Sequence, residues 1–161
     1  MNNYTNYLNQ QAEFIYGQGI NPDYSRATTK NYIIGRNGVA GCDFNFAAPA
    51  NTTQQNLSIG AIILAQCVIT QVAVICLETV AGGAVSDFKV SCGNVSAGVN
   101  FLALATCKTL NQFLQLAAVP SLDWTTVNNV FFGGVPTGAN WSALTNGKWQ
   151  LTVVYNDFSY L

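Results

Sequence analysis

The longest uncharged apolar stretch of the chain runs from Ile59 to Leu77, and its nineteen residues could span a membrane as a helix. Nine of the nineteen are β-branched, however, and such side chains favour strands. Polar residues interrupt the middle, and no Lys or Arg lies between Arg36 and Lys89 to provide a positive flank. The stretch therefore predicts buried β-structure, and membrane insertion of residues 59–77 is kept as an alternative.

We expect this stretch to divide at Ala65–Gln66 into two strands, because polar residues begin there. Side chains alternate between the faces of a strand, so the second strand has two faces. One face carries Val68, Thr70, Val72, Val74 and Cys76, and the other carries Ile69, Gln71, Ala73, Ile75 and Leu77. Both faces are largely apolar, which predicts a strand covered on both sides, by a second sheet and by a neighbouring subunit or segment.

The chain after this stretch consists of short units separated by turn residues. Gly82-Gly83 and Gly133-Gly134 are interpreted as turns, the second pair closing a strand. The segment 101–120 fits either a helix or two strands. Between the turns, residues 87–92 alternate, with Phe88, Val90 and Cys92 predicted inward and Asp87, Lys89 and Ser91 outward.

The clearest strand covers residues 148–157, after Asn146-Gly147, a dipeptide that fits a tight turn with positive φ. Its alternation places Trp149, Leu151, Val153 and Tyr155 on one face. Several short strands at regular spacing are typical of a β-sandwich. We therefore predict an all-β protein in which residues 57–161 form a β-sandwich of jelly-roll type.

Residues 1–56 differ in composition from the rest, being rich in Asn, Gln and Tyr and lacking a sustained helical or strand period. We interpret them as an extended, mostly irregular N-terminal arm that docks on a neighbour. Aromatic side chains bury much area at a low cost in rotamer entropy, so they suit such a contact. The predicted assembly contacts are Tyr4, Tyr7, Phe14, Tyr16, Tyr24 and Tyr32. Deletion of residues 2–50 is then expected to leave a folded domain that no longer assembles.

Charge is scarce: 8% of the residues are charged, against roughly 25% in ordinary domains, and the net charge is −1. With six Lys and Arg and no basic cluster, we expect no nucleic-acid partner. An uncharged polar surface repels copies of itself weakly, so it suits a protein that packs against sister subunits.

Histidine is absent, which excludes Ser-His-Asp and Cys-His catalytic arrangements. The acidic residues are scattered singly, and no glycine pair has the context of a phosphate-binding loop. Five cysteines stand at positions 42, 67, 76, 92 and 107, without a CxxC pair. The last four lie in apolar stretches and are predicted to be reduced, buried and inert. We therefore expect no enzyme, no metal site and no cofactor.

Three tryptophans allow a second hypothesis, since exposed indoles can stack on sugars. Trp149 lies in the inward phase of its strand and is assigned to the core. Trp124 and Trp141 lie at strand or loop edges. We interpret these two as core or subunit contacts, with a glycan platform as the alternative.

The stretches "IILAQCVITQVAVICLETV", "FKVSCGN" and "GKWQLTVVYND" give the chain a resemblance to β-sandwich domains of tailed-phage virions, over about residues 57–161. Members of that class serve as head decoration proteins, head fibres or tail appendages, commonly as trimers. The resemblance implies a capsid decoration or head-fibre subunit, assembled in the host cytoplasm into the virion. Its partners would be sister subunits in a homotrimer and a capsid or tail protein. The alternatives are a tail-fibre or receptor-binding module that contacts host glycans, and the small membrane-associated protein described above.

Overall fold

The computed structural model describes residues 26–35, 43–63, 67–115 and 128–157, which form eight strands and one short 3-10 helix, η1. The strands are β1 (Arg26–Gly35), β2 (Gln55–Ile63), β3 (Cys67–Ala81), β4 (Asp87–Gly93), β5 (Leu102–Thr106), β6 (Phe113–Gln115), β7 (Asn128–Thr137) and β8 (Asn146–Asp157), and η1 covers Trp141–Ala143.

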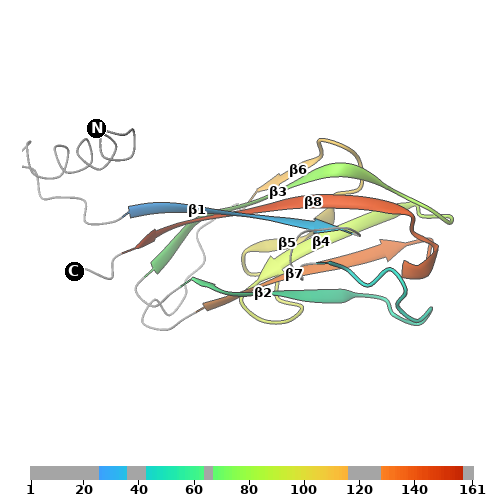
Figure 1. Ribbon diagram of the computed structural model, residues 1–161, viewed down its shortest axis with the longest axis horizontal. Coiled ribbons are helices and arrows are strands. Elements are labelled where there is room, and N and C mark those ends of the chain that lie inside the picture. Colours follow the sequence, from blue (N-terminus) through green and yellow to red (C-terminus); the bar gives the residue numbers. More distant parts are fainter. Residues whose placement is uncertain (1–25, 36–42, 64–66, 116–127, 158–161) are drawn as a thin grey trace, which may run out of the picture.

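The strands form two four-stranded sheets, with the orders β1-β8-β3-β6 and β2-β7-β4-β5, and neighbouring strands are antiparallel throughout (Figure 1). The chain passes from one sheet to the other at most connections, as in a sandwich of two Greek keys. This strand order is that of an eight-stranded jelly roll, and it confirms the predicted fold class.

The strand β8 lies in the centre of its sheet, between β1 and β3. Its predicted alternation is confirmed, because Trp149, Leu151, Val153 and Tyr155 are all buried. The predicted turn at Asn146-Gly147 is wrong, because both residues lie inside β8, although Gly147 has a φ of +149°, in the region that favours glycine. Strong period-2 patterning thus predicted the strand that joins the two halves of this sheet.

The apolar stretch also divides as predicted, with β2 ending at Ile63 and β3 beginning at Cys67. The predicted faces of β3 are wrong at its start, however. A bulge between Ile69 and Gln71 shifts the register against β8, so that Ile69 is buried while Thr70 is exposed. A bulge reverses which alternate residues face inward, and only beyond it do Val72, Val74 and Cys76 point into the core as expected.

Of the two glycine pairs, only Gly82-Gly83 forms a turn, with φ values of +109° and +56°. Gly133-Gly134 lies inside β7, so the interpretation of this pair as a turn is wrong. A Cβ atom at Gly134 would lie 2.6 Å from Cζ of Phe44, and one at Gly133 would lie 2.6 Å from Oγ of Ser91. These glycines therefore allow side chains to approach the backbone closely in the middle of a strand.

The segment 101–120, for which the sequence allowed a helix or two strands, forms the strands β5 and β6 over its described residues.

In β4, Phe88, Val90 and Cys92 are buried as predicted, whereas Ser91, predicted outward, is only 1% exposed. Oγ of Ser91 lies over Gly133, the neighbouring position on β7, where the side chains of Gln54 and Asn56 also lie. Four of the cysteines are buried, as expected, and Cys42 lies outside the described residues.

The predicted boundary between arm and sandwich is wrong, because the sandwich begins well before residue 57. Residues 26–35 form β1, which pairs with β8 along its whole length. Residues 44–48 then reach into the core, with Phe44, Phe46 and Ala48 buried and the residues between them exposed. We call Phe44, Phe46 and Ala48 the plug. A segment that lacks a sustained helical or strand period can still contribute single residues to the core. The irregular sequence of residues 1–56 was therefore not evidence for an arm.

The plug is fixed by the side chains beside it. Asn45 donates its backbone N–H to Oε1 of Gln55 at 2.8 Å, and its carbonyl accepts from Nε2 of Gln55 at 2.8 Å. The Asn45 side chain in turn accepts from the N–H of Ala47 at 2.9 Å. This reciprocal pairing ties the plug to the first residue of β2.

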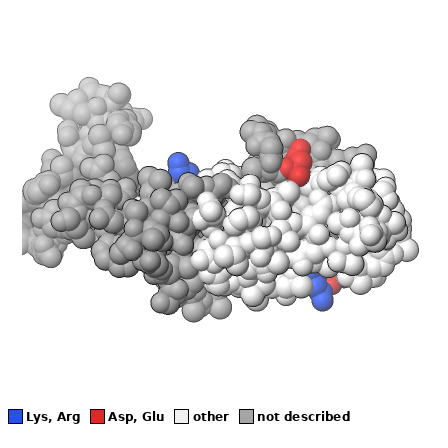
Figure 2. Space-filling view, turned by 90° about the horizontal axis from the view of Figure 1, so that it is seen from below, with Lys and Arg blue, Asp and Glu red and all other residues white. Residues whose placement is uncertain are grey.

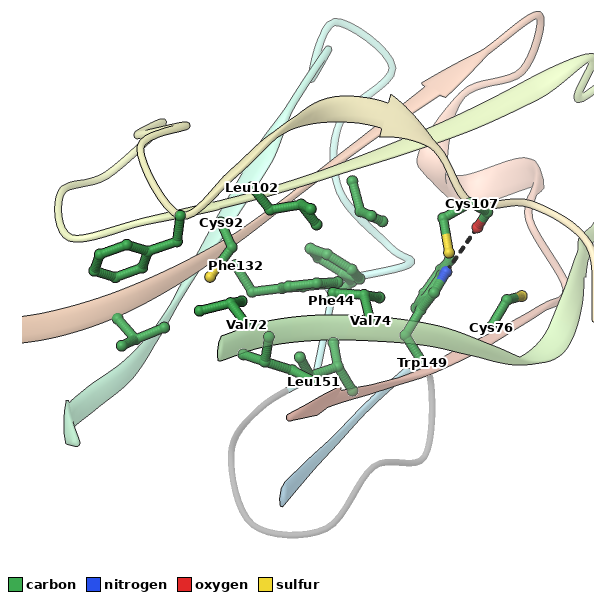
Figure 3. Packing of buried hydrophobic residues seen from close by; sticks show 14 of the residues in the cluster. Phe44, Val72, Val74, Cys76, Cys92, Leu102, Cys107, Phe132, Trp149 and Leu151 are labelled. Carbon is green, nitrogen blue, oxygen red and sulfur yellow. Dashed lines mark hydrogen bonds between the residues drawn. The ribbon is translucent and has the colours of Figure 1, made fainter. Parts of the chain in front are cut away.

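Phe44 lies at the centre of an aromatic core drawn from both sheets (Figure 3). Its ring centroid lies 6.2 Å from Phe88, 5.8 Å from Phe132, 4.9 Å from Trp141 and 5.7 Å from Trp149. Phe88 and Trp149 stack on each other at 4.6 Å. Since Phe88 and Phe132 belong to one sheet and Trp149 to the other, Phe44 fills the space between the sheets.

Deleting residues 2–50 is now expected to abolish folding, because it removes β1 and the plug. Truncating a buried Phe alone costs about 3–5 kcal/mol, a large part of the roughly 5–15 kcal/mol by which domains are stable. Phe44→Ala should therefore lower the free energy of unfolding by about that amount. Circular dichroism and urea denaturation measure both effects.

The matched control is deletion of residues 2–25, which leaves all eight strands and the plug intact. We expect this shorter chain to retain its β-structure and cooperative unfolding. A folded product of the longer deletion would show that β1 and the plug are dispensable.

Candidate assembly surface

Of the residues predicted to contact an assembly, the structure describes Tyr32 and Trp141, and both belong to the sandwich. Tyr32 lies on β1 opposite Leu151, half-buried and packed against the core, so it belongs to the sandwich. Trp141 is fully buried in the aromatic core, which excludes it as a glycan platform in this structure. The other predicted contacts, Tyr4, Tyr7, Phe14, Tyr16, Tyr24 and Trp124, lie outside the described residues.

Within the described part of the chain, no group of three or more His, Cys, Asp or Glu side chains could hold a metal ion. No helix among the described residues is long and apolar enough to cross a membrane. The described residues of 59–77 lie instead on β2 and β3, one in each sheet.

Large apolar side chains are exposed along one continuous part of the chain, residues 95–113. Leu110 is 57% exposed and Phe113 is 54% exposed, values that belong to unpartnered surface residues. We call this set the β5–β6 flank; it comprises Val95, Val99, Leu104, Leu110 and Phe113. Such residues are the ones expected at a contact surface rather than on a fully solvated one.

The flank follows the free edges of both sheets. Among the described residues, β5 is the last strand of one sheet and pairs with β4 alone, and β6 is the last strand of the other sheet and pairs with β3 alone. Edge strands are commonly protected from association by charged residues or proline. The sequences of β5 (LALAT) and β6 (FLQ) contain neither.

The loop before β5 holds Val95 and Val99 in a defined conformation. Asn94 accepts from the Nδ2 of Asn100 at 3.0 Å, and the backbone N–H of Asn94 donates to Oδ1 of Asn100 at 3.0 Å. Gly98 closes a turn by donating to the carbonyl of Val95 at 2.8 Å. The two valines are therefore presented by a hydrogen-bonded loop, at a low entropic cost of binding.

The connection from β5 to β6 is also held in place by hydrogen bonds. Oε1 of Gln112 accepts from the N–H of Lys108 at 2.8 Å, and the N–H of Leu110 donates to Oγ1 of Thr79 at 2.9 Å. The ammonium of Lys108 donates to the carbonyls of Val85, at 2.9 Å, and Ser86, at 3.3 Å. Lys108 is the positively charged residue nearest in sequence to Leu110 and Phe113, and its ammonium group is therefore hydrogen-bonded to the segment between β3 and β4.

Sequence reasoning missed the flank, for a physical reason that Leu104 illustrates. Leu102 and Leu104 are two apart, so regular alternation would place both inward. The register against β4 is irregular between Val90 and Cys92, which leaves Leu102 buried and turns Leu104 outward. The available signal was the absence of charge in residues 90–107, which is unusual for a segment that contains an edge strand.

Sparse charge extends beyond the flank. Figure 2 shows a face of the molecule on which charged side chains are few and the described surface is otherwise uncharged. Such a face gains little from long-range electrostatic steering, so association through it depends on apolar contact and hydrogen bonding.

The thiol of Cys92 is a poor candidate for nucleophilic chemistry. Burial in the core raises the pKa of Cys92 to about 12, and a thiol with that pKa is protonated at neutral pH.

Comparison with known proteins assigns the chain to no family. No family model matches it, and no curated protein matches it.

The raised pKa of Cys92 predicts loss of stability in alkali. In the unfolded chain the thiol ionises near 9, so above that pH the unfolded state releases a proton that the folded state keeps. The stabilising contribution is complete below pH 9 and is lost progressively as the pH rises toward 12, by up to about 4 kcal/mol.

Urea denaturation at a series of pH values, under reducing conditions, measures this loss. Other groups also titrate in that range, so the comparison is with Cys92→Ala, which should lose stability less steeply above pH 9. Parallel curves for the two proteins would contradict the assignment of the titration to Cys92.

Proposed function

We propose that the protein is a structural subunit of a virus particle, a capsid decoration or head-fibre subunit, which acts by burying surface against its neighbours. The observation that carries the proposal is the β5–β6 flank, five exposed apolar side chains, of which Leu104 and Phe113 lie on the outer strands β5 and β6 and the other three lie in the adjoining loops. The chemistry of the described residues offers contact rather than catalysis, and the proposal assigns the chain no reaction.

Burial of the β5–β6 flank against a partner would also contribute favourable free energy. Burying a half-exposed Leu or Phe side chain contributes on the order of 1 kcal/mol from its apolar area. Because the loops at both ends of the flank are held by hydrogen bonds, little of that energy is lost in ordering them. Backbone groups on the free sides of β5 and β6 can add hydrogen bonds to a strand of the partner.

Sister subunits are the first partners that we propose, in the homotrimer that the resemblance to phage virion domains implies. Symmetry brings like charges together around an axis, so a surface without charge associates with copies of itself at no repulsive cost. A capsid or tail protein is the second partner. Its contact would lie on surfaces that the trimer leaves open.

The fold supports the proposal by analogy. Eight-stranded jelly rolls occur in viral capsid proteins, in lectins and in cupins, so the fold alone selects none of them. Cupin-type metal chemistry draws on histidine ligands, and this chain has no histidine. The scarcity of charge and the exposed flank favour the structural role among the remaining possibilities.

The alternative of a glycan-binding tail module is weakened by the position of Trp141 in the core. The alternative of membrane insertion is weakened because the described residues of 59–77 belong to β2 and β3.

Introducing a positive charge into the flank should dissociate the oligomer. Phe113→Lys removes an apolar contact and places an ammonium group in the interface, so association should weaken roughly tenfold or more. Sedimentation velocity at micromolar concentration should show a trimer for the wild-type protein and a monomer for the variant.

Thr29→Lys is the matched control, since Thr29 is an exposed residue of β1, the opposite edge of the same sheet as β6. This variant should remain a trimer. A monomeric wild-type protein, or equal dissociation of both variants, would refute the role of the flank. Mass spectrometry of purified virus particles tests the viral part separately, because peptides of this chain should copurify with capsid proteins.

A further inference from the structure

An unpaired hydroxyl group lies on the outer side of the sheet β2-β7-β4-β5, away from the aromatic core. Ser91 stands on β4 between Val90 and Cys92, whose side chains are buried in the core, so its own side chain points to the opposite face of the sheet. Ser91 is nevertheless only 1% exposed, and its Oγ has no hydrogen-bond partner among the described residues. A buried hydroxyl without a partner destabilises a fold, so a ligand that pairs with Ser91 gains free energy by satisfying it.

Polar side chains from β2 and the loop before it converge on the same place. Asn56, Gly133 and Ser91 occupy paired positions on β2, β7 and β4, which are neighbouring strands of one sheet (Figure 1). A Cβ atom at Gly133 would lie 2.6 Å from Oγ of Ser91 and 3.0 Å from Oδ1 of Asn56. The same atom would lie 3.3 Å from Nε2 of Gln54. We call Gln54, Asn56, Ser91 and Gly133 the Ser91 site.

The hydrogen-bonding groups of the Ser91 site define the chemistry of its ligand. Nε2 of Gln54 donates to Oδ1 of Asn56 at 2.8 Å, so one amide presents a donor to the site and the other presents an acceptor. The Ser91 hydroxyl can donate or accept. An anion would be repelled by the Asn56 carbonyl oxygen, and a hard cation requires more oxygen ligands than the site provides. A ligand hydroxyl fits all three groups, because it donates one hydrogen bond and accepts two.

Phe131 gives the Ser91 site an apolar neighbour. It lies two residues before Gly133 on β7, so it belongs to the same face of the sheet, and it is half-buried. A sugar ring has hydroxyl groups at its rim and C–H groups on its faces, which suits a polar site with an aromatic side chain beside it. Gln54 is half-exposed in the loop before β2, so rotation of its side chain can open the site without movement of the strands.

We propose that the Ser91 site binds a hydroxyl group of a neutral saccharide. The ligand hydroxyl donates to Oδ1 of Asn56 and accepts from Nε2 of Gln54 and Oγ of Ser91, which replaces the hydrogen bond between the two amides. The missing side chain at Gly133 leaves space for this hydroxyl, and Phe131 contacts the C–H groups of the ring. The proposal adds ligand recognition to the structural role, and it does not depend on whether the β5–β6 flank binds a sister subunit.

The test follows the side-chain amide signals of Gln54 and Asn56 in proton–nitrogen correlation spectra of the full-length protein. The titrants are glucose, galactose, mannose and N-acetylglucosamine. At least one of these sugars should shift both signals saturably, with a dissociation constant on the order of 1 mM for a single ring. Acetamide is titrated in parallel as a probe of an amide ligand. Inorganic phosphate probes an anionic ligand, which Lys89, two residues before Ser91 on β4, would attract.

Gly133→Ala fills the site and Ser91→Ala removes its hydroxyl, so each should weaken sugar binding by about tenfold or more. Ser91→Ala should keep or raise the melting temperature, because the hydroxyl that it removes has no partner. Weaker binding by this variant would therefore not reflect unfolding. Ser142→Ala removes an exposed hydroxyl of η1 and is the matched control, which should bind sugar as the wild-type protein does.

Three results would overturn the proposal. In the first, no sugar shifts the two amide signals, and the site accommodates water only. In the second, acetamide or phosphate shifts them and the sugars do not. In the third, Ser91→Ala binds sugar as tightly as the wild-type protein.

Discussion

The packing of Phe44 between the two sheets is the interaction on which the rest of this structure depends. Its ring touches Phe88 and Phe132 from one sheet and Trp149 from the other, and Gly134 must lack a side chain to admit it. A jelly roll has to fill the space between two twisted sheets, and here an irregular segment between β1 and β2 supplies the filling. The sandwich is therefore closed by a residue that belongs to no strand.

This arrangement also affects which kinds of side chain remain on the surface. The largest aromatic side chains of the described chain are used inside, and so few residues are charged that solubility relies on amide and hydroxyl groups. Among the described residues, the large exposed apolar side chains lie on β5 and β6, the outer strands of the two sheets, and in the loops beside them. A domain of this kind gains most by placing those edges against a neighbour, which is the basis of the structural role proposed for it.

The sequence predicted those strands in which polar and apolar residues alternate regularly. It did not predict the segments in which this alternation is interrupted. The pattern of Trp149 to Tyr155 predicted β8 correctly, because β8 pairs with β1 in regular register and the irregularity on its other side is a bulge in β3. Bulges in β3 and β5 reversed the faces of Ile69 and Leu104, and a bulge has no signature in a single sequence. Phe44 was assigned to an arm because the alternation of Phe44, Phe46 and Ala48 covers only five residues, and residues 1–56 as a whole show no sustained period.

Hydrogen exchange followed by mass spectrometry, at concentrations above and below the association midpoint, tests the central claim most directly. If the protein acts by burying the β5–β6 flank, amides in residues 102–115 should exchange more slowly in the concentrated sample, while those of β1 exchange at the same rate in both. Protection of β1 with unchanged exchange in residues 102–115, or no dependence on concentration, would contradict the account.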